Sequence, residues 1–254
     1  MATATSCGSV TAPGLGLPLG VTVPAAKGTL PKQMFVGRAP ISSKLRQRFA
    51  HDVESIAMMA ILRPANTGLA EGRACREILV LGIHVAPGVA VPVEVIDHIA
   101  AQRASGILFV CVRDAAASES GEGGGAASAG EGGEQCAFAV RRNVPVRAGH
   151  TPVTKVYAGE WKPASQARIA LSGATMDELW DSLCAQTILG ETDGADVDGR
   201  IAAMNRAKAL TAEYEKLQAA HARARTTERR NEAYAKMHAI RAELDRLGVS
   251  PGRA

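Results

Sequence analysis

The triplet Glu160-Trp161-Lys162 has a spacing that metal-dependent nucleases use. Restriction-type nucleases hold a divalent metal with one carboxylate and place an acid-x-lysine pair on a neighbouring strand. Asp114 follows a predicted strand, and Glu54 lies on a predicted helix, so these two carboxylates could complete an acidic set. One hypothesis is therefore a divergent metal-dependent nuclease that uses Glu160, Lys162, Asp114 and Glu54.

The surroundings of the triplet argue against that hypothesis. Pro163 follows at once, so the triplet resembles the end of a strand, and no Pro-Asp pair precedes it. The apolar run at 76–85 predicts a central strand, but it offers no carboxylate after Glu77. We therefore keep the nuclease as the alternative function and not as the leading one.

Other catalytic and metal-binding patterns are missing from the sequence. No two of the five cysteines are spaced as CxxC, and the six histidines show no ligand spacing with them, so we expect no metal site. The cysteines are expected to be small buried hydrophobic residues in a reducing compartment. His84 and His98 lie on or beside apolar faces, where histidine is more often structural. Neither GxSxG nor GxxxxGK[ST] is present, and we expect no cofactor.

A basic C-terminal arm is the second candidate site. Residues 200–247 hold eleven arginines or lysines against six acids, after an acidic stretch over 160–199. The arginines at the centre of the arm could contact DNA phosphates, with an affinity that falls as salt rises. The alternative, which we favour, is a solvated helical surface in which nearby glutamates pair with them. The candidate nucleic-acid-binding residues are Arg223, Arg225, Arg229 and Arg230.

Composition places the chain among globular proteins with a buried core. The sequence has 254 residues, of which 46% are apolar and only 4% aromatic, so aliphatic side chains must fill the core. The net charge of +4 is too small to identify a partner by itself. No apolar run is long enough to span a membrane, and the N-terminus lacks the basic region of a secretory signal. We therefore expect a cytoplasmic protein with no membrane contact.

The pattern along the chain predicts an α+β fold. Ser42 or Ser43 can cap a helix whose apolar residues recur every three or four positions, and β-branched runs later in the chain indicate strands. These elements form a mixed sheet of four or five strands packed with helices. We expect helices over 42–62, 93–103 and 176–189, and strands over 76–85, 106–112, 136–142, 152–158 and 168–171.

The chain is predicted to divide into three regions. Small and polar residues predict a disordered N-terminus over 1–13. An α+β domain covers 14–190, beginning with a proline-rich extended segment over 14–41 and carrying a flexible glycine-rich insertion at 115–133. Two heptad-like seams over 200–247 predict a basic, coiled-coil-like helical hairpin. One seam holds Leu210, Tyr214, Leu217 and His221, and the other holds Ala233, Met237, Ile240, Leu244 and Leu247.

Several short motifs, taken in order, resemble the bacterial and archaeal domain-of-unknown-function family numbered 4391. The resemblance covers roughly residues 14–247 and depends on the order of the motifs and on the matching length. The glycine-rich insertion at 115–133 departs from the family pattern. The motifs are Leu17-Pro18; Leu30-Pro31-Lys32 with Phe35; the run from Leu45 to Ile56; Leu62 with Pro64 and Asn66; Glu77 to Val80; Val95 to Asp97; Ile107 to Val110; Trp161; and Leu179 to Leu183.

The resemblance implies no established enzymatic activity. It implies an association with DNA methyltransferases and helicases of restriction-like defence loci, which is an association and not a mechanism. We therefore expect a non-enzymatic accessory or adaptor subunit of a restriction-like or antiphage defence system. It would dock a helicase or a DNA methyltransferase, and its C-terminal helices would give self-association, a second contact or weak DNA binding.

Overall fold

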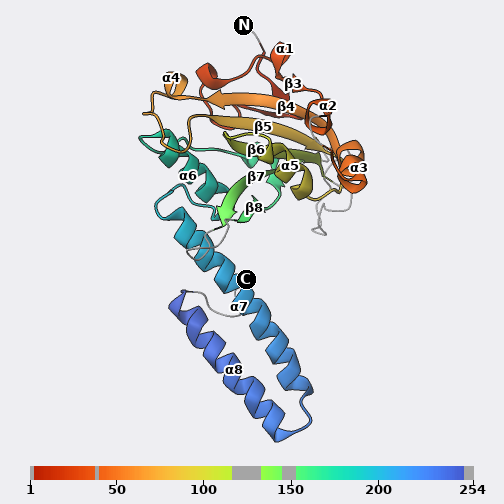
Figure 1. Ribbon diagram of the computed structural model, residues 1–254, viewed down its shortest axis with the longest axis vertical. Helices are drawn as coiled ribbons and strands as arrows, with labels where there is room; N and C mark the ends of the chain where they lie inside the picture. Colours follow the sequence, from red (N-terminus) through yellow and green to blue (C-terminus); the bar gives the residue numbers. More distant parts are fainter. Residues whose placement is uncertain (1–2, 38–39, 116–132, 145–152, 249–254) are drawn as a thin grey trace, which may run out of the picture. The chain divides into compact units, whose positions relative to one another are not determined.

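The computed structural model describes residues 3–37, 40–115, 133–144 and 153–248. The chain divides into two compact units, residues 1–197 and 198–254. The first unit contains the sheet, and the second contains a pair of long helices (Figure 1). The predicted α+β class with a C-terminal helical pair is therefore confirmed. The predicted insertion at 115–133 lies outside the described residues, except for Ala115 and Gly133 at its ends.

The first unit is built on one mixed sheet in the order β3-β4-β5-β6-β7-β8, with β9 paired to β7. β5 and β6 are parallel, and the other paired strands are antiparallel. The sheet has seven strands in the described residues, more than predicted, because β3, β4 and β9 join it. The strands are β3 (Thr29–Leu30), β4 (Val53–Leu62), β5 (Ile78–Val85), β6 (Gly106–Asp114), β7 (Glu134–Val144), β8 (Val153–Ala158) and β9 (Lys162–Pro163).

The prediction of one helix over 42–62 is wrong for its second half. Helix α3 (Ser43–His51) begins as predicted, because the Ser42 hydroxyl accepts a hydrogen bond from the backbone N–H of Leu45 at 3.1 Å. The chain then continues as β4. Apolar residues of β4 are buried on both faces of the sheet, so the strand lacks strict alternation and its spacing also fits a helix.

One face of the sheet packs against α3 and against α5 (Val93–Ala101), the crossover helix between β5 and β6. Alternate residues of β5, from Leu79 to Val85, point to this face and form a core with Phe109 of β6 and Ile96 of α5. Both strands are also buried on their other face, which is why each reads as a continuous apolar run in the sequence.

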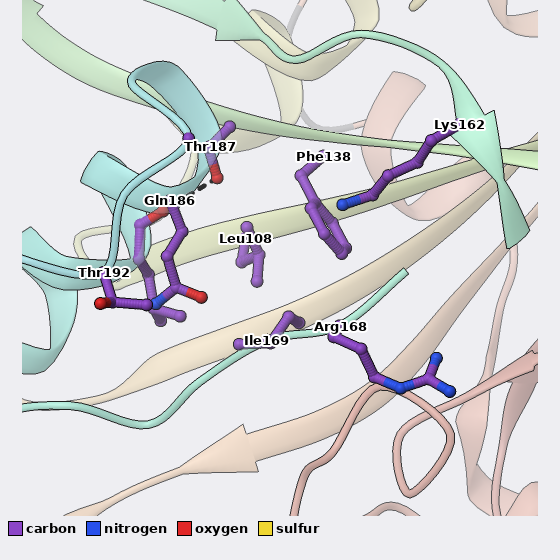
Figure 2. A pocket seen from close by; sticks show the side chains of 10 residues that line it. Leu108, Phe138, Lys162, Arg168, Ile169, Gln186, Thr187 and Thr192 are labelled. Atoms are coloured by element: carbon purple, nitrogen blue, oxygen red, sulfur yellow. Dashed lines mark hydrogen bonds between the residues drawn. The ribbon is translucent and has the colours of Figure 1, made fainter. Parts of the chain in front are cut away.

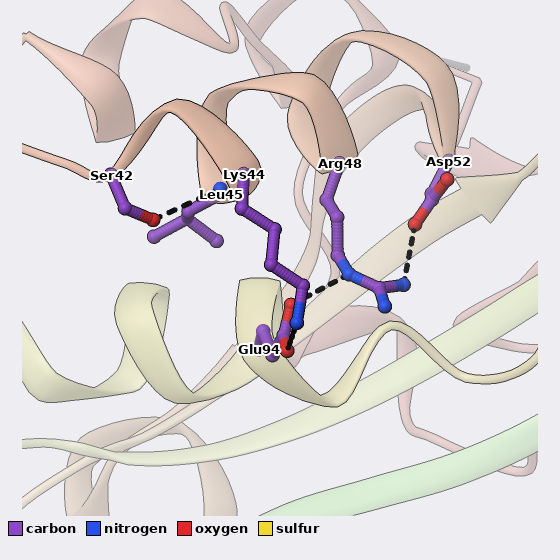
Figure 3. Close-up of polar contacts among 6 residues, drawn as sticks. All are labelled: Ser42, Lys44, Leu45, Arg48, Asp52 and Glu94. Atoms are coloured by element: carbon purple, nitrogen blue, oxygen red, sulfur yellow. Dashed lines mark hydrogen bonds and ion pairs between the residues drawn. The ribbon is translucent and has the colours of Figure 1, made fainter.

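A polar network joins α3 to α5 at the surface (Figure 3). Glu94 accepts a hydrogen bond from Lys44 Nζ at 2.9 Å and forms an ion pair with Arg48 Nε at 2.6 Å, while Arg48 Nη1 reaches Asp52 Oδ2 at 3.0 Å. The hydrogen bond from Lys44 and the charge of Arg48 lower the pKa of the Glu94 carboxyl. Because Lys44, Arg48 and Glu94 are exposed, water screens their charges, and the network contributes little to stability.

The opposite face of the sheet is covered in part by the N-terminal hairpin, β1 (Ser6–Cys7) and β2 (Val10–Thr11). Cys7 is buried against Gly82 of β5, where a Cβ on the glycine would lie 2.5 Å from the Cys7 Cβ. The prediction of disorder over 1–13 is wrong for this hairpin. Its small residues show no pattern of their own, because packing on the sheet, and not local propensity, orders them.

Short elements connect the hairpin to the sheet, β4 to β5, and the sheet to α6 (Met176–Ile188). The segment at 14–41 was predicted to be extended, but its described part holds short helices and one two-residue strand, and its prolines leave no long helix there. The predicted strand at 168–171 is wrong, because its backbone bonds elsewhere: Ile169 N–H donates to Leu15 O at 2.8 Å, and Ala170 bonds the Gln186 side chain. The short elements are η1 (Leu19–Val21), α1 (Ala25–Gly28), α2 (Gln33–Val36), α4 (Pro64–Thr67) and η2 (Ala164–Gln166).

The second unit is an antiparallel helical pair in which α7 (Val197–Arg223) is followed by α8 (Thr227–Arg246) (Figure 1). Its apolar seam contains Leu210 from α7 with Ile240 and Leu244 from α8, and Tyr214 and Leu217 pack against it. These residues belong to the two predicted seams. In the part of the chain that the structure describes, no helix combines the length and the apolar character needed to cross a membrane.

Candidate metal centre at the strand ends

Four neighbouring strands each present an ionisable side chain at the same end of the sheet. His84 and Asp114 lie near the carboxyl ends of the parallel strands β5 and β6. Glu54 and Glu134 lie at the starts of β4 and β7, which run antiparallel to their neighbours and so begin where β5 and β6 end. The topology thus gathers residues that are far apart in the sequence.

His84, Asp114 and Glu134 converge on one point. Their ligand atoms all lie within 4.8 Å of one another, and His84 Nε2 is 3.9 Å from Glu134 Oε1. Register explains the convergence: His84 pairs with Val112, Asp114 is two residues further along the same face of β6, and Glu134 is directly opposite Asp114.

Glu54 orients the imidazole ring of His84. Its Oε2 lies 2.6 Å from Nδ1 of His84. Glu54 sits at a register shift between Val53 and Ser55, and such β-bulges redirect side chains. A carboxylate only accepts hydrogen bonds, so Nδ1 carries a proton in this contact. In the neutral ring, Nε2 is then the nitrogen with a free lone pair, and it faces Glu134.

Glu134 is held by the turn of the N-terminal hairpin. Its Oε2 accepts hydrogen bonds from the backbone N–H of Ser9, at 2.6 Å, and from the Ser9 hydroxyl. The preceding residue, Gly8, has a φ of +55°, and a Cβ there would collide with the Glu134 carboxylate. The positive φ favours glycine at this position, and a side chain here would push the Glu134 carboxylate out of its place.

The three converging side chains offer one imidazole nitrogen and two carboxylate oxygens, a donor set suited to divalent ions. Asp114 is exposed, while His84 and Glu134 are partly buried, so an ion held here would keep positions open to water or substrate. Such an ion can polarise a bound oxygen or lower the pKa of bound water.

A family model for a domain of unknown function, DUF4391, matches residues 15–244. The chain belongs to the DUF4391 family. This confirms the family resemblance found in the sequence. Among curated proteins and among solved structures, nothing matches the chain.

The residues proposed from sequence for a nuclease in this DUF4391 chain do not form one group. Asp114 and Glu54 come to the strand-end cluster, but Glu160 is exposed and is not part of it. Lys162 pairs with Cys136 across β9 and β7, and its ammonium lies 4.9 Å from the Phe138 ring centroid. The acid-x-lysine spacing therefore does not place Glu160 or Lys162 beside the carboxylates of the strand-end cluster.

Lys162 instead borders a separate cavity of about 190 Å³ next to α6 (Figure 2). Apolar side chains such as Leu108 and Phe138 line it, and Lys162 reaches toward the phenyl ring. Two polar lining residues are bonded to neighbouring backbone: Arg168 donates to carbonyl oxygens of its own loop, and Gln186 bonds Ala170. Because of these bonds, few polar groups in the cavity are left to bind a ligand.

The cysteines of the DUF4391 chain are all buried and free of disulfides, as expected for small hydrophobic residues. Burial raises the pKa of the Cys136 thiol to about 12, against the opposing charge of Lys162. Burial also raises the pKa of Cys7. Because the thiolate is the reactive form, neither residue is a nucleophile near neutral pH.

The four candidate arginines of the helical pair differ in their surroundings. Arg223 donates to Ala219 O at 3.1 Å, and Arg230 donates to Ala224 O at 3.3 Å. Both arginines therefore supply hydrogen bonds to carbonyl groups at or just after the C-terminal end of α7, where positive charge is favourable. All four arginines are exposed, but Arg225 and Arg229 make no such side-chain hydrogen bond within the described residues. These two are therefore the arginines best placed to meet a phosphate.

Proposed function

We propose that this DUF4391 protein is a non-enzymatic accessory subunit that docks a larger DNA-processing protein, such as a helicase or a DNA methyltransferase. The observation that carries the proposal is the helical pair. Helices of 27 and 20 residues form a compact unit whose apolar seam is used internally, and whose outer surface is polar and charged. A unit of this kind suits a contact with a partner better than catalysis.

Two details of the helical pair suggest where a partner binds. Tyr234 is 61% exposed on α8, and exposed aromatic residues are enriched among the residues that contribute most to interfaces. Arg225 and Arg229 are exposed at the turn between the helices, where they can add weak DNA contact. The association of the family with methyltransferases and helicases supports the same class of partner.

The experiment is an affinity purification of the tagged full-length protein from its native host. It is run at low and high salt, with and without nuclease. Recovery of a helicase or methyltransferase that survives both treatments supports docking. Recovery of nucleic acid alone, lost at high salt, contradicts it and makes the arginines the functional site.

Variants sharpen that experiment. Tyr234→Ala should reduce recovery of the protein partner. The double variant Arg225→Ala/Arg229→Ala should reduce only recovery of nucleic acid. Its matched control, Lys208→Ala/Arg241→Ala, removes the same charge from exposed positions on α7 and α8 away from the turn.

A divergent metal-dependent nuclease is the second candidate function. It is favoured by one observation, the convergence of Glu54 and Asp114 with His84 and Glu134. The test is cleavage of plasmid DNA by the full-length protein with Mg²⁺ or Mn²⁺. On this hypothesis Asp114→Asn abolishes cleavage, while Glu160→Gln, which alters an exposed carboxylate outside the cluster, leaves it unchanged. Loss of cleavage in both Asp114→Asn and Glu160→Gln would instead support the set chosen from sequence, which contains both carboxylates.

A further inference from the structure

Three carboxylates surround one imidazole at the strand ends. Glu54 bonds Nδ1 of His84, Glu134 faces Nε2, and Asp114 lies within ligand distance of both His84 and Glu134. Among the described residues, no lysine or arginine forms an ion pair with any of these carboxylates. Like charges this close repel one another unless a cation or a proton compensates them. We propose that His84, Asp114 and Glu134 bind a divalent transition metal ion, which fastens the N-terminal hairpin to the sheet.

The spacing of the donor atoms fits a metal ion. Ligands bonded to an ion at about 2.0–2.2 Å lie within roughly 4.4 Å of one another. The observed limit of 4.8 Å is slightly larger, and His84 Nε2 already lies 3.9 Å from Glu134 Oε1. Asp114 is exposed and can rotate to close the remaining gap.

The contacts behind the donor atoms fit as well. A metal-binding histidine usually donates its other ring N–H to a carboxylate, which fixes the tautomer and raises the basicity of the ligand nitrogen. Glu54 makes this contact with His84. Glu134 is similarly fixed, because Ser9 bonds Oε2 and leaves Oε1 facing His84. Two of the three ligands are thus oriented in advance.

The donor set selects a class of ion. Imidazole nitrogen suits Zn²⁺, Fe²⁺ and Mn²⁺ better than Mg²⁺ or Ca²⁺, which prefer oxygen ligands alone. The two carboxylates keep the site compatible with Mn²⁺. We therefore expect Zn²⁺ and Mn²⁺ to bind more tightly than Mg²⁺, with Zn²⁺ ahead of Mn²⁺.

The hairpin is part of the site through Ser9. A cation on Oε1 of Glu134 fixes the carboxylate, whose Oε2 accepts both bonds from Ser9. Binding should therefore slow the opening of the hairpin, since a ligand that binds only the closed form stabilises that form.

The first measurement is calorimetric titration of metal-stripped full-length protein with ZnCl₂ or MnCl₂, and with MgCl₂ for comparison. Wild type should bind one Zn²⁺ or Mn²⁺ ion, and Asp114→Asn should weaken binding by at least about tenfold. Glu54→Gln should weaken it by roughly 10–100-fold without removing a ligand. Glu160→Gln, the matched control, should bind as wild type does. Absence of binding by wild type, or equal affinity in Asp114→Asn and wild type, overturns the proposal.

The second measurement is hydrogen exchange with and without Zn²⁺. The amides of Ser9 and its hairpin neighbours should exchange more slowly with the ion in wild type but not in Asp114→Asn, while α8 serves as an unaffected reference. Binding that leaves hairpin exchange unchanged would overturn the fastening role. Neither measurement requires a partner protein or DNA, so both are independent of the docking function.

Discussion

The strand-end cluster and the turn of the helical pair both concentrate one sign of charge, but they hold it differently. At the strand ends, Glu54 and Ser9 fix the side chains that face one another. At the turn all four arginines are exposed. Arg223 bonds a carbonyl of α7 and Arg230 bonds Ala224 O just after it, whereas Arg225 and Arg229 show no side-chain hydrogen bond within the described residues. Concentrated charge alone is common on protein surfaces. A cluster whose members are oriented by further bonds is the stronger indication of a binding site.

The largest effect should come from the apolar seam of the helical pair. Leu244 is fully buried between α8 and α7, so Leu244→Ala leaves a cavity and should lower the free energy of unfolding of the helical pair by about 2–5 kcal/mol. Metal affinity at the strand ends should not change. Thermal unfolding, monitored by hydrogen exchange of amides in each unit, measures the stability of the two units separately. The control is Leu19→Ala, which makes the same deletion at a side chain that is 75% exposed.

The corresponding substitution in the sheet unit is made at Gly82, which packs against the N-terminal hairpin. A Cβ there collides with Cys7, so Gly82→Ala should displace the hairpin and destabilise the sheet unit by about 1–3 kcal/mol. Because the hairpin carries Ser9, metal affinity should fall as well. Gly20→Ala is the matched control, since a Cβ at Gly20 meets nothing within 4 Å. Unchanged denaturant midpoints for Gly82→Ala would show that the hairpin is not packed as described.

The same contrast explains which parts of the fold could be predicted from the sequence. β5, β6 and α6 carry their own signals, namely apolar β-branched runs and a Thr175 cap that accepts from Glu178 N–H. The N-terminal hairpin has no such signal, because it is ordered by contact with Gly82 and its neighbours. β4 was assigned to a helix, because burial on both faces removes the alternation that identifies a strand.

The site was predictable only in part. Residue type was enough to select Glu54 and Asp114, but His84 was interpreted as structural and Glu134 was not selected. Their convergence depends on strand order, register and the bulge at Glu54, none of which a single sequence reveals. Adjacent strand ends that each carry a metal-binding residue type were the available signal. Glu160 and Lys162 were selected by local spacing, which does not determine where side chains meet.

Asp177 provides a reference for a carboxylate held without a metal. It accepts backbone N–H groups from Cys75 and Arg73 at 2.7 Å and from Ala74 at 3.1 Å, and these bonds, led by that from Cys75, lower its pKa. A lowered folded-state pKa gives stability above the unfolded value, near about 3.9, that is lost as pH falls through the folded pKa. Asp177→Ala should cost about 1–2 kcal/mol at pH 7.

The pH dependence provides the check on that prediction. Denaturant unfolding between pH 2 and 7 should show a smaller loss of stability on acidification in Asp177→Ala than in wild type. Asp177→Asn keeps an acceptor oxygen without the charge, so it should lie between the two at pH 7. An identical acid slope in wild type and Asp177→Ala would mean that these hydrogen bonds do not persist in solution.

The smallest effects should separate the arginines at the turn from one another. Arg230→Ala removes the bond to Ala224 O and should lower the stability of the helical pair by about 0.5 kcal/mol. Arg225→Ala should leave stability unchanged but, if the turn meets DNA, should lower duplex affinity and reduce the salt slope by about one. Thermal melts and anisotropy titrations at several salt concentrations measure the two quantities. The reverse pattern would assign the phosphate contact to Arg230, and would mean that a side chain bonded to backbone can leave that bond for a ligand.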